Sequence, residues 1–395
     1  MRTECFADRL CYVVLMVLLI SLTGCAGQRT ASKGPYTFWP GSDLPRIQFL
    51  TEVNSNFDVI EQQRGFQLIS FEAPEKIEFE PIIKPTGVTV HKGKLYVCDA
   101  GRTAVFVIDF VNKTFEKFTG AIGRGSFNKP LNLAFSDDDY MYVADVNRQE
   151  VLVFDPLGGF VRSFGRDELF KPTDVAVYED KVYVTDAKDH HVKIYDRLTY
   201  KLIDQIGRGS DMSPERLSIP LHMAMDDKGE LYVTNTGTGR IIKMDRDGHL
   251  LMAFGGMGNV VSLFGRPRGI HVDDQGLIYV VDASHQNIQI FNQEGRLLMF
   301  FGGSNEMRLP ASVAVSTENL EFFQQYAAPN FELERVVYVS NHFGDKRLAV
   351  YGLGQRRGVD YEAEYRLIRE EREAEIAREK AEAEQAQEDG AAAGQ

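Results

Sequence analysis

The chain has 395 residues, of which 44% are hydrophobic, and this is enough to bury a large core. The formal net charge is −13, while 35 glycines and 11% aromatic residues favour many short strands joined by tight turns. The four cysteines form no Cys-x-x-Cys-His sequence, which excludes a covalently attached c-type haem.

Residues 1–24 have the pattern of an export signal, with an apolar stretch from Cys11 to Leu22 after a weakly charged start. A helix of this stretch reaches only about 18 Å, too short for a bilayer core of about 30 Å, so we predict a signal peptide. The sequence Leu22-Thr23-Gly24-Cys25 resembles the bacterial lipobox. This resemblance implies cleavage before Cys25 and diacylation of its thiol. An ordinary secretory signal that happens to contain a cysteine is the alternative.

Acyl chains on Cys25 would anchor the protein without a spanning helix, because each buried methylene contributes about 0.8 kcal/mol. Residues 25–45 would then form a linker. Ala26, rather than Asp, follows the cysteine, which by resemblance favours the outer membrane. We therefore expect the bacterial cell envelope, on the periplasmic or cell-surface side. Once the signal and Cys25 are set aside, Cys98 is the remaining thiol, so no intramolecular disulfide is predicted.

One unit recurs six times in the middle of the chain. Each copy has a proline, then two residues later a four-residue apolar strand, a polar turn, Tyr-Val, and two residues on Asp or Asn. The prolines are spaced by 42 to 48 residues. They are Pro85, Pro130, Pro172, Pro220, Pro267 and Pro310, and the acidic or amide positions are Asp99, Asp145, Asp186, Asn235, Asp282 and Asn341.

Each unit contains four strand-like runs, which in the second unit cover 131–135, 140–144, 150–154 and 159–164. Turn residues such as Asp, Asn and Gly separate the runs. Four antiparallel strands in about 45 residues form one blade of a propeller. We therefore predict an all-β fold, a six-bladed β-propeller over residues 46–354.

The fifth unit carries a resemblance to NHL repeats, a family of propeller blades. The phrases that carry it are 278–282 (Ile-Tyr-Val-Val-Asp), 287–291 (Asn-Ile-Gln-Ile-Phe) and 300–302 (Phe-Phe-Gly). Across the six units the resemblance extends over roughly residues 81–353. It implies a rigid disk of NHL-type blades that presents its loops on two faces.

The last unit supplies three strands, 312–316, 336–340 and 347–351, and lacks a fourth. Segment 46–53, upstream of the first unit, has the pattern of an unpaired strand. Joining both ends of the chain in one blade would remove an exposed sheet edge, so we predict that closure. We expect 54–84 to pack on the side or base of the propeller. The long turn 317–334 is either a contact surface or a tolerated surface loop.

Residues 355–395 form a charged tail that differs from the repeats. From Asp360 onward it has 12 acidic and 5 basic residues among strong helix formers. We predict a helix that frays, or a disordered tail, serving either as a solvated spacer or as a partner-binding segment.

Polar residues mark the position two places after the repeat proline, where the innermost strand would line a central channel. Three successive units have Asn132, Asp174 and His222 there, and His271 lies two residues further along its own strand. Such side chains are reasonable ligands for calcium or zinc. Channels of propellers are also ordinarily polar, so structural lining is the alternative. No sequence motif identifies a catalytic residue.

Antiparallel strands place two sets of loops on one face, which we name the top face: those joining second to third strands and those joining successive blades. A partner-binding face is one interpretation of its arginines, because it would steer an anionic partner. Ordinary turn charges are the other interpretation. These arginines are Arg102, Arg124, Arg148, Arg166, Arg208, Arg240, Arg266 and Arg268.

Taken together, the sequence favours a lipid-anchored binding scaffold that mediates protein–protein interaction. Its expected partners are the membrane, through the acyl chains, and another envelope protein, but no nucleic acid and no cofactor. The alternative is a metal-dependent hydrolase or lyase, similar to propeller lactonases or the amidating lyase. That enzyme would hold Ca or Zn at the central channel.

Overall fold

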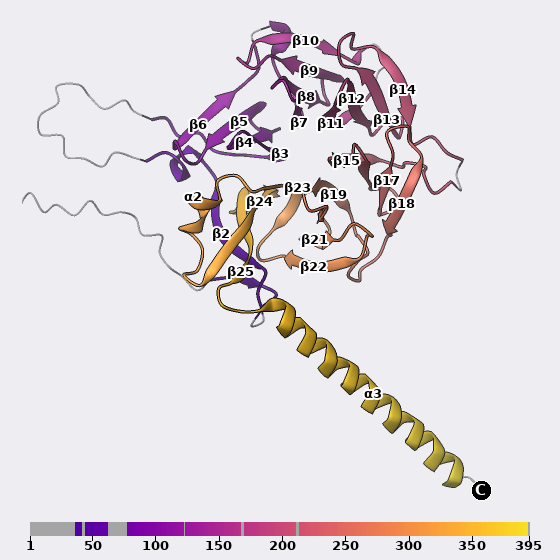
Figure 1. The fold of residues 1–395 in the computed structure, drawn as a ribbon. Coiled ribbons are helices and arrows are strands. Elements are labelled where there is room, and N and C mark those ends of the chain that lie inside the picture. Colours follow the sequence, from indigo (N-terminus) through magenta and orange to yellow (C-terminus); the bar gives the residue numbers. More distant parts are fainter. Residues whose placement is uncertain are drawn as a thin grey trace, which may run out of the picture. The chain divides into compact units, whose positions relative to one another are not determined.

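The structure, a computed structural model, describes residues 36–41, 44–61, 77–121, 123–166, 170–210 and 213–393, with side chains described to residue 378. The predicted signal peptide and Cys25 lie outside the described residues. Five four-stranded sheets and one five-stranded sheet surround a common axis (Figure 1). The innermost strands contact one another in sequence and close the ring between the first blade and the last. The prediction of an all-β, six-bladed propeller is confirmed.

In blades 1 to 5 each blade is an antiparallel sheet whose strands follow the chain from the innermost strand outward. Blade 1 contains β3 (Pro85–His91), β4 (Lys94–Asp99), β5 (Ala104–Asp109) and β6 (Thr114–Phe118). Blade 2 contains β7 (Pro130–Phe135), β8 (Met141–Asp145), β9 (Glu150–Phe154) and β10 (Phe160–Phe164). Blade 3 contains β11 (Pro172–Tyr178), β12 (Lys181–Asp186), β13 (His191–Asp196) and β14 (Leu202–Ile206).

Blades 4 and 5 repeat this plan, and blade 6 differs from it. Blade 4 contains β15 (Pro220–Met225), β16 (Leu231–Asn235), β17 (Arg240–Met244) and β18 (Leu250–Gly255). Blade 5 contains β19 (Pro267–Val272), β20 (Ile278–Asp282), β21 (Asn287–Phe291) and β22 (Leu297–Gly302). Blade 6 contains β23 (Arg308–Ser316), β24 (Phe331–Phe343), β25 (Leu348–Arg356), β2 (Ile47–Val53) and β1 (Phe38–Trp39).

The two ends of the repeat region meet in blade 6. Strand β2 pairs antiparallel with β25, so that Ile47 lies opposite Leu353 and Val53 opposite Leu348. This is the place where the sequence analysis put the closing strand. Strand β1 then pairs with β2 and adds a fifth strand that the repeat pattern did not predict. Because the chain's first and last strands share one sheet, β25 has no exposed edge.

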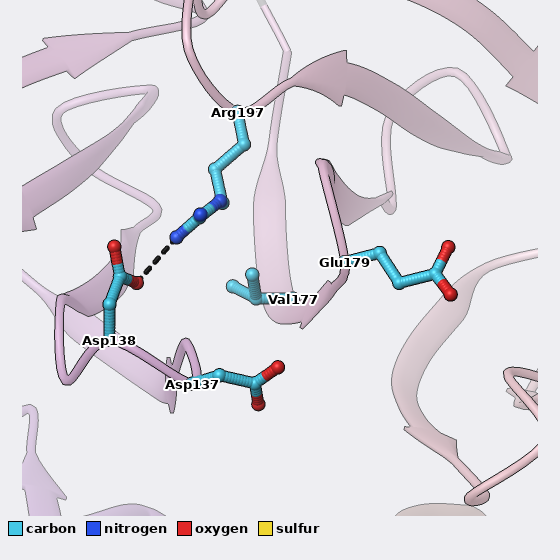
Figure 2. Close-up of a pocket in the computed structure, with 5 residues that line it drawn as sticks. All are labelled: Asp137, Asp138, Val177, Glu179 and Arg197. Carbon is cyan, nitrogen blue, oxygen red and sulfur yellow. Dashed lines mark hydrogen bonds and ion pairs between the residues drawn. The ribbon is translucent and has the colours of Figure 1, made fainter.

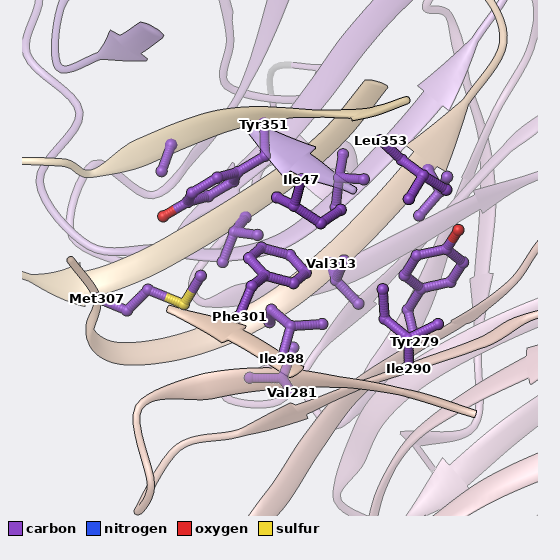
Figure 3. Close-up of a cluster of buried hydrophobic side chains, with 14 residues drawn as sticks. Ile47, Tyr279, Val281, Ile288, Ile290, Phe301, Met307, Val313, Tyr351 and Leu353 are labelled. Atoms are coloured by element: carbon purple, nitrogen blue, oxygen red, sulfur yellow. The ribbon is translucent and has the colours of Figure 1, made fainter. Parts of the chain in front are cut away.

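Apolar side chains fill the spaces between adjacent blades. Figure 3 shows this packing between blades 5 and 6, where Ile47 of the closing strand contacts a cluster that includes Phe301, Val313 and Tyr351. Ile47 is fully buried there. The ring of Phe301 packs on that of Tyr351 with centroids 5.0 Å apart. The closing strand therefore supplies core side chains as well as backbone pairing.

The long turn of blade 6 packs against the joint between the last blade and the first. It contains the short helix α2 (Leu320–Gln324), whose Phe323 is fully buried. The Phe323 ring lies 5.0 Å from the ring of Phe110 in blade 1. Gln48 of β2 accepts the backbone N–H of Ala328 at 2.9 Å. The turn therefore contacts both blade 1 and the closing strand β2, and it stabilises the joint between the first and last blades.

Two segments flank the propeller. In the extension after β2, the short helix η1 (Asn56–Asp58) is fixed by Asn56, which donates to Glu78 O and accepts from Glu80 N–H. After β25, helix α3 spans Tyr361–Ala393. The buried Tyr361 hydroxyl donates to Pro45 O at 2.8 Å. Among the residues described, no helix is both long and apolar enough to cross a membrane.

Candidate functional site

A carboxylate at the end of the second strand fixes the loops of the top face. In blade 5, Asp282 is fully buried and accepts the backbone N–H groups of Gly265, Arg266 and Ser284 at 2.8–3.0 Å. It therefore ties the loop that enters the blade to the turn that leaves β20. The equivalent residues of the first four blades also accept backbone N–H groups through their side chains; they are Asp99, Asp145, Asp186 and Asn235. In blades 1, 2, 3 and 5 these bonds position the residue before the repeat proline, and in blade 4 the bond is to Ser218, two residues before Pro220.

The innermost strands of blades 2, 3 and 4 are joined through Asp174. Asn132 Nδ2 donates to Asp174 Oδ1 at 2.6 Å, and the Met223 backbone N–H donates to Asp174 Oδ2 at 2.9 Å. His222 Nδ1 lies 3.4 Å from Asp174 Oδ2 without forming a hydrogen bond. The structure thus brings together three of the four channel residues that the sequence singled out.

Close approach of the innermost strands explains the glycine at the same position of blade 1. A Cβ on Gly87 would lie 2.1 Å from Asn132 Oδ1. No side chain fits there, so glycine allows β3 to pack directly on the Asn132–Asp174 pair.

His271 does not join this group, although it lies on the innermost strand of its blade. Its ring packs near Tyr279 with centroids 6.5 Å apart, and the charges that act on it are those of Asp273 and Arg335. Burial lowers the pKa of His271 to about 4, so the ring is neutral near neutral pH. His271 lies two residues further along its strand than the position that Asp174 occupies in blade 3, and this shift moves its side chain away from Asp174.

The arrangement around Asp174 does not suit a metal ion. Oδ1 already accepts Asn132 Nδ2 and the Val175 N–H, and Oδ2 accepts the Met223 N–H, so both oxygens are committed to hydrogen-bond donors. Within the described part of the chain, no three His, Cys, Asp or Glu side chains are grouped to hold a metal. The side chains around Asp174 therefore do not fit a calcium or zinc site.

A second polar contact, between Arg268 of β19 and His342 of β24, joins blades 5 and 6. Arg268 Nη1 lies 3.4 Å from His342 Nδ1. Burial and the charge of Arg266 lower the pKa of Arg268 to about 10. Burial, Arg268 and Lys84 lower the pKa of His342 to about 3. The sequence analysis missed His342, although it stands where the other units have Ala, Val or Thr after the acidic or amide position.

The eight arginines predicted for the top face fall into two groups. Those with a side-chain or backbone acceptor are Arg102 (Glu80), Arg148 (Glu150 and Ser126 O), Arg208 (Gln205) and Arg268 (His342). The other four have exposed side chains and, among the described residues, no acidic partner; they are Arg124 in the short helix η2 (Gly123–Gly125), Arg166, Arg240 and Arg266. The second group leaves positive charge available to a partner.

The opposite face, which we name the bottom face, carries acidic side chains between blades 2 and 3. Figure 2 shows a cleft of about 200 Å³ lined by Asp137, Asp138, Val177, Glu179 and Arg197. Arg197 forms an ion pair with Asp138. Hydrogen bonding from Ser136 and the charge of Arg197 lower the pKa of Asp138. This cleft of the bottom face is therefore acidic, although the same face also exposes Lys201, Lys228 and Arg296.

Comparison with protein families identifies part of the repeat region. The model of the NHL repeat matches residues 264–291, which run from the end of the blade 4–5 loop through β21. This chain contains an NHL repeat. The matched NHL repeat includes Arg268 and Asp282, whose carboxylate holds the top-face loop. It lies in the blade where the sequence resemblance was strongest.

One curated relative is similar in sequence, and two solved structures are similar in fold. The protein called brain tumor from Drosophila melanogaster is 29% identical over 140 residues, 33% of this chain and only 13% of that relative. Among solved structures, a gluconolactonase from Xanthomonas campestris has a TM-score of 0.52 at 14% identity, covering 82% of this chain and 96% of its own. A protein of unknown function from Bacteroides thetaiotaomicron has a TM-score of 0.54 at 13% identity, covering 78% and 75%. At these identities the two structures show a shared fold alone.

Proposed function

We propose that this protein is a lipid-anchored binding scaffold of the bacterial cell envelope, with Cys25 as its anchor and another envelope protein as its partner. The observation that carries the binding role is the set of exposed top-face arginines that have no acidic partner among the described residues. Arg124, Arg166 and Arg240 are exposed on the top face, whereas Asp137 and Glu179 are exposed on the bottom face. We therefore assign the top face to a partner with an acidic surface.

The loops of the top face are suited to binding because they are fixed before a partner arrives. Asp282 and its equivalents hold them through buried hydrogen bonds. Loops that are already ordered lose little conformational entropy on association. The arginines would accelerate encounter with an acidic surface, and salt would weaken that steering.

The anchor rests on the sequence around Cys25, which lies outside the described residues. Leu22-Thr23-Gly24-Cys25 supports lipidation by resemblance to the lipobox. Two or three acyl chains hold a protein at a bilayer without any spanning segment. The proposed outer-membrane location separates the protein from RNA, so nucleic acid is not among the proposed partners.

Lipidation is tested by expressing the full chain in a bacterial host with a labelled fatty acid. We expect label and membrane association in the wild-type protein and in Cys98→Ser, whose substituted thiol is buried in blade 1. Cys25→Ser should lose both properties. Label that persists in Cys25→Ser, or its absence from the wild-type protein, would refute the anchor.

The binding face is tested by crosslinking in intact cells and identifying the captured envelope protein. One variant reverses three top-face charges with Arg124→Glu, Arg166→Glu and Arg240→Glu. The matched control makes the same charge change on exposed bottom-face residues with Lys201→Glu, Lys228→Glu and Arg296→Glu. We expect capture to be lost in the first variant and kept in the control. Equal capture by both variants would contradict the assignment of the top face.

A further inference from the structure

Three buried nitrogen atoms near the top ends of blades 4, 5 and 6 have no hydrogen-bond partner within the described part of the chain. They are His222 Nδ1, Arg268 Nε and His342 Nε2, and we name these three residues the axial cluster. His222 is 6% exposed and His342 is 8% exposed, so water satisfies them poorly. Buried polar atoms in folded proteins are nearly always paired with a protein group or an ordered water, so three in one cluster mark a place where a bound partner would be favourable.

The contact between Arg268 and His342 fixes the chemistry of the imidazole. A guanidinium can only donate hydrogen bonds, so His342 Nδ1, which faces Arg268 Nη1 at 3.4 Å, must be an acceptor. The neutral ring then carries its proton on Nε2. The unpaired Nε2 of His342 is therefore a hydrogen-bond donor, as is the unpaired Nε of Arg268. Both donors call for an acceptor.

The charge around the axial cluster gives the sign of that acceptor. No carboxylate among the described residues lies within ion-pair distance of Arg268, although most of the described buried cations have one, as Lys193 has Asp186 and Arg335 has Asp273. Lys84 and Arg266 add two further positive charges close enough to depress the pKa of His342. A partly buried guanidinium without a counter-charge is unfavourable. An anion at this place would offset that cost.

We propose that Arg268 and His342 form a binding site for a monoanionic carboxylate group. The planar edge of a guanidinium matches the two oxygens of a carboxylate, and the Nε2–H of His342 supplies a further donor. The carboxylate of Asp174, 3.4 Å from His222 in the same cluster, repels a dianion such as phosphate more strongly than a monoanion. This site is distinct from the exposed arginines assigned above to the protein partner.

The ligand would approach from the top face. Arg266, which precedes β19, is exposed there, and Arg268 is partly exposed. Two sources supply a monoanionic carboxylate: a small organic acid and the C-terminus of a peptide or protein. Both use the same recognition chemistry, so the experiment includes a probe for each.

The test is calorimetric titration of the full chain, purified in detergent, with acetate, with acetyl-Ala-Ala, with the C-terminal amide of that dipeptide, and with inorganic phosphate. We expect acetate or the dipeptide to bind, and the amide and phosphate to bind at least about tenfold more weakly. A dipeptide that binds about tenfold more tightly than acetate assigns the site to a chain terminus, whereas equal affinities assign it to small acids. No binding by either carboxylate, or tighter binding of the amide or phosphate, would overturn the proposal.

Variants then connect the binding to the two residues. Arg268→Gln and His342→Gln should each weaken carboxylate binding at least about tenfold, while Arg296→Gln, an exposed bottom-face control, should leave it unchanged. Arg268→Lys keeps the charge but lacks the guanidinium edge, so it should also bind more weakly and serves if Arg268→Gln fails to fold. Unchanged affinity in either folded Arg268 variant would refute the site.

Discussion

Asn132 and Asp174, on the innermost strands of adjacent blades, share a hydrogen bond of 2.6 Å that is buried at both ends. The other oxygen of Asp174 accepts the Met223 N–H of the next blade at 2.9 Å. One carboxylate therefore connects three consecutive blades where their strands come closest. An apolar side chain in place of Asp174 would leave these buried donors unpaired. The strands also approach closely here, since a Cβ on Gly87 would lie 2.1 Å from Asn132 Oδ1.

The first prediction concerns this connection. Asp174→Ala leaves Asn132 Nδ2 and the N–H groups of Val175 and Met223 without their acceptor, so we expect a loss of about 2–5 kcal/mol in the free energy of unfolding. Denaturant unfolding of the full chain measures it. The control Asp137→Ala removes an exposed carboxylate and should cost less than about 0.5 kcal/mol. Similar losses in both variants would show that Asp174 is not a structural connection.

The second prediction concerns the carboxylate that latches the top-face loops. Asp282→Ala removes the acceptor of the Gly265, Arg266 and Ser284 N–H groups, and we expect a loss of about 2–4 kcal/mol. Asp282→Asn should cost less than half of that, because blade 4 uses Asn235 at this position and its oxygen accepts the Ser218 N–H. Thermal unfolding of the two variants makes the comparison. An Asn variant as unstable as the Ala variant would mean that charge, rather than the acceptor, fixes the loop.

The blades were predictable from the sequence because the same types of residue recur in the same order in each unit. In blades 1 to 5 a proline is the first residue of the innermost strand, and an Asp or Asn at the end of the second strand holds the loop that enters the blade. The closing strand was predictable because blade 6 lacked a fourth strand. Strand β1 and helix α2 were not, because neither recurs and each depends on a local contact with β2, β24 or blade 1.

The polar cluster was predictable only where one strand position repeats. Asn132, Asp174 and His222 share that position, and two of them bond directly. The contact of Arg268 with His342 joins side chains 74 residues apart from different strand positions, so spacing along the chain cannot reveal it. His342 did leave one trace, an imidazole where the other units have small residues. Its importance depends on burial, which only the packed blades provide.

The third prediction tests the closure of the ring. Ile47→Ala removes a fully buried side chain from the packing between blades 5 and 6, and we expect a loss of about 2–4 kcal/mol. The matched control Ile203→Ala makes the same chemical change in β14, where the side chain is 52% exposed. Chemical denaturation of both variants gives the comparison. Equal stability of the two variants would contradict the role of β2 in closing the propeller.

The fourth prediction concerns acid, and its sign follows from two buried histidines. Burial lowers the pKa of His271 to about 4 and, together with the charge of Arg268, lowers that of His342 to about 3. Both rings titrate near 6.5 in the unfolded chain. Below that pH the two imidazoles bind protons in the unfolded state but not in the folded state. The free energy of unfolding should therefore fall as the pH falls from about 6.5 toward 4.

Unfolding by urea at several pH values between about 7 and 5 measures the slope, and we expect each histidine to contribute about 1–2 kcal/mol of loss. His271→Gln and His342→Gln should each flatten the curve. The matched control is His249→Gln, because the hydrogen bond and charge of Asp245 raise the pKa of that exposed ring and so oppose the trend. A stability that stays level over this range, or variants as steep as the wild-type protein, would mean that both imidazoles accept protons inside the fold. For His342 this would also remove the reason for treating Nδ1 as the acceptor that faces Arg268, because both nitrogens of a protonated imidazole are donors.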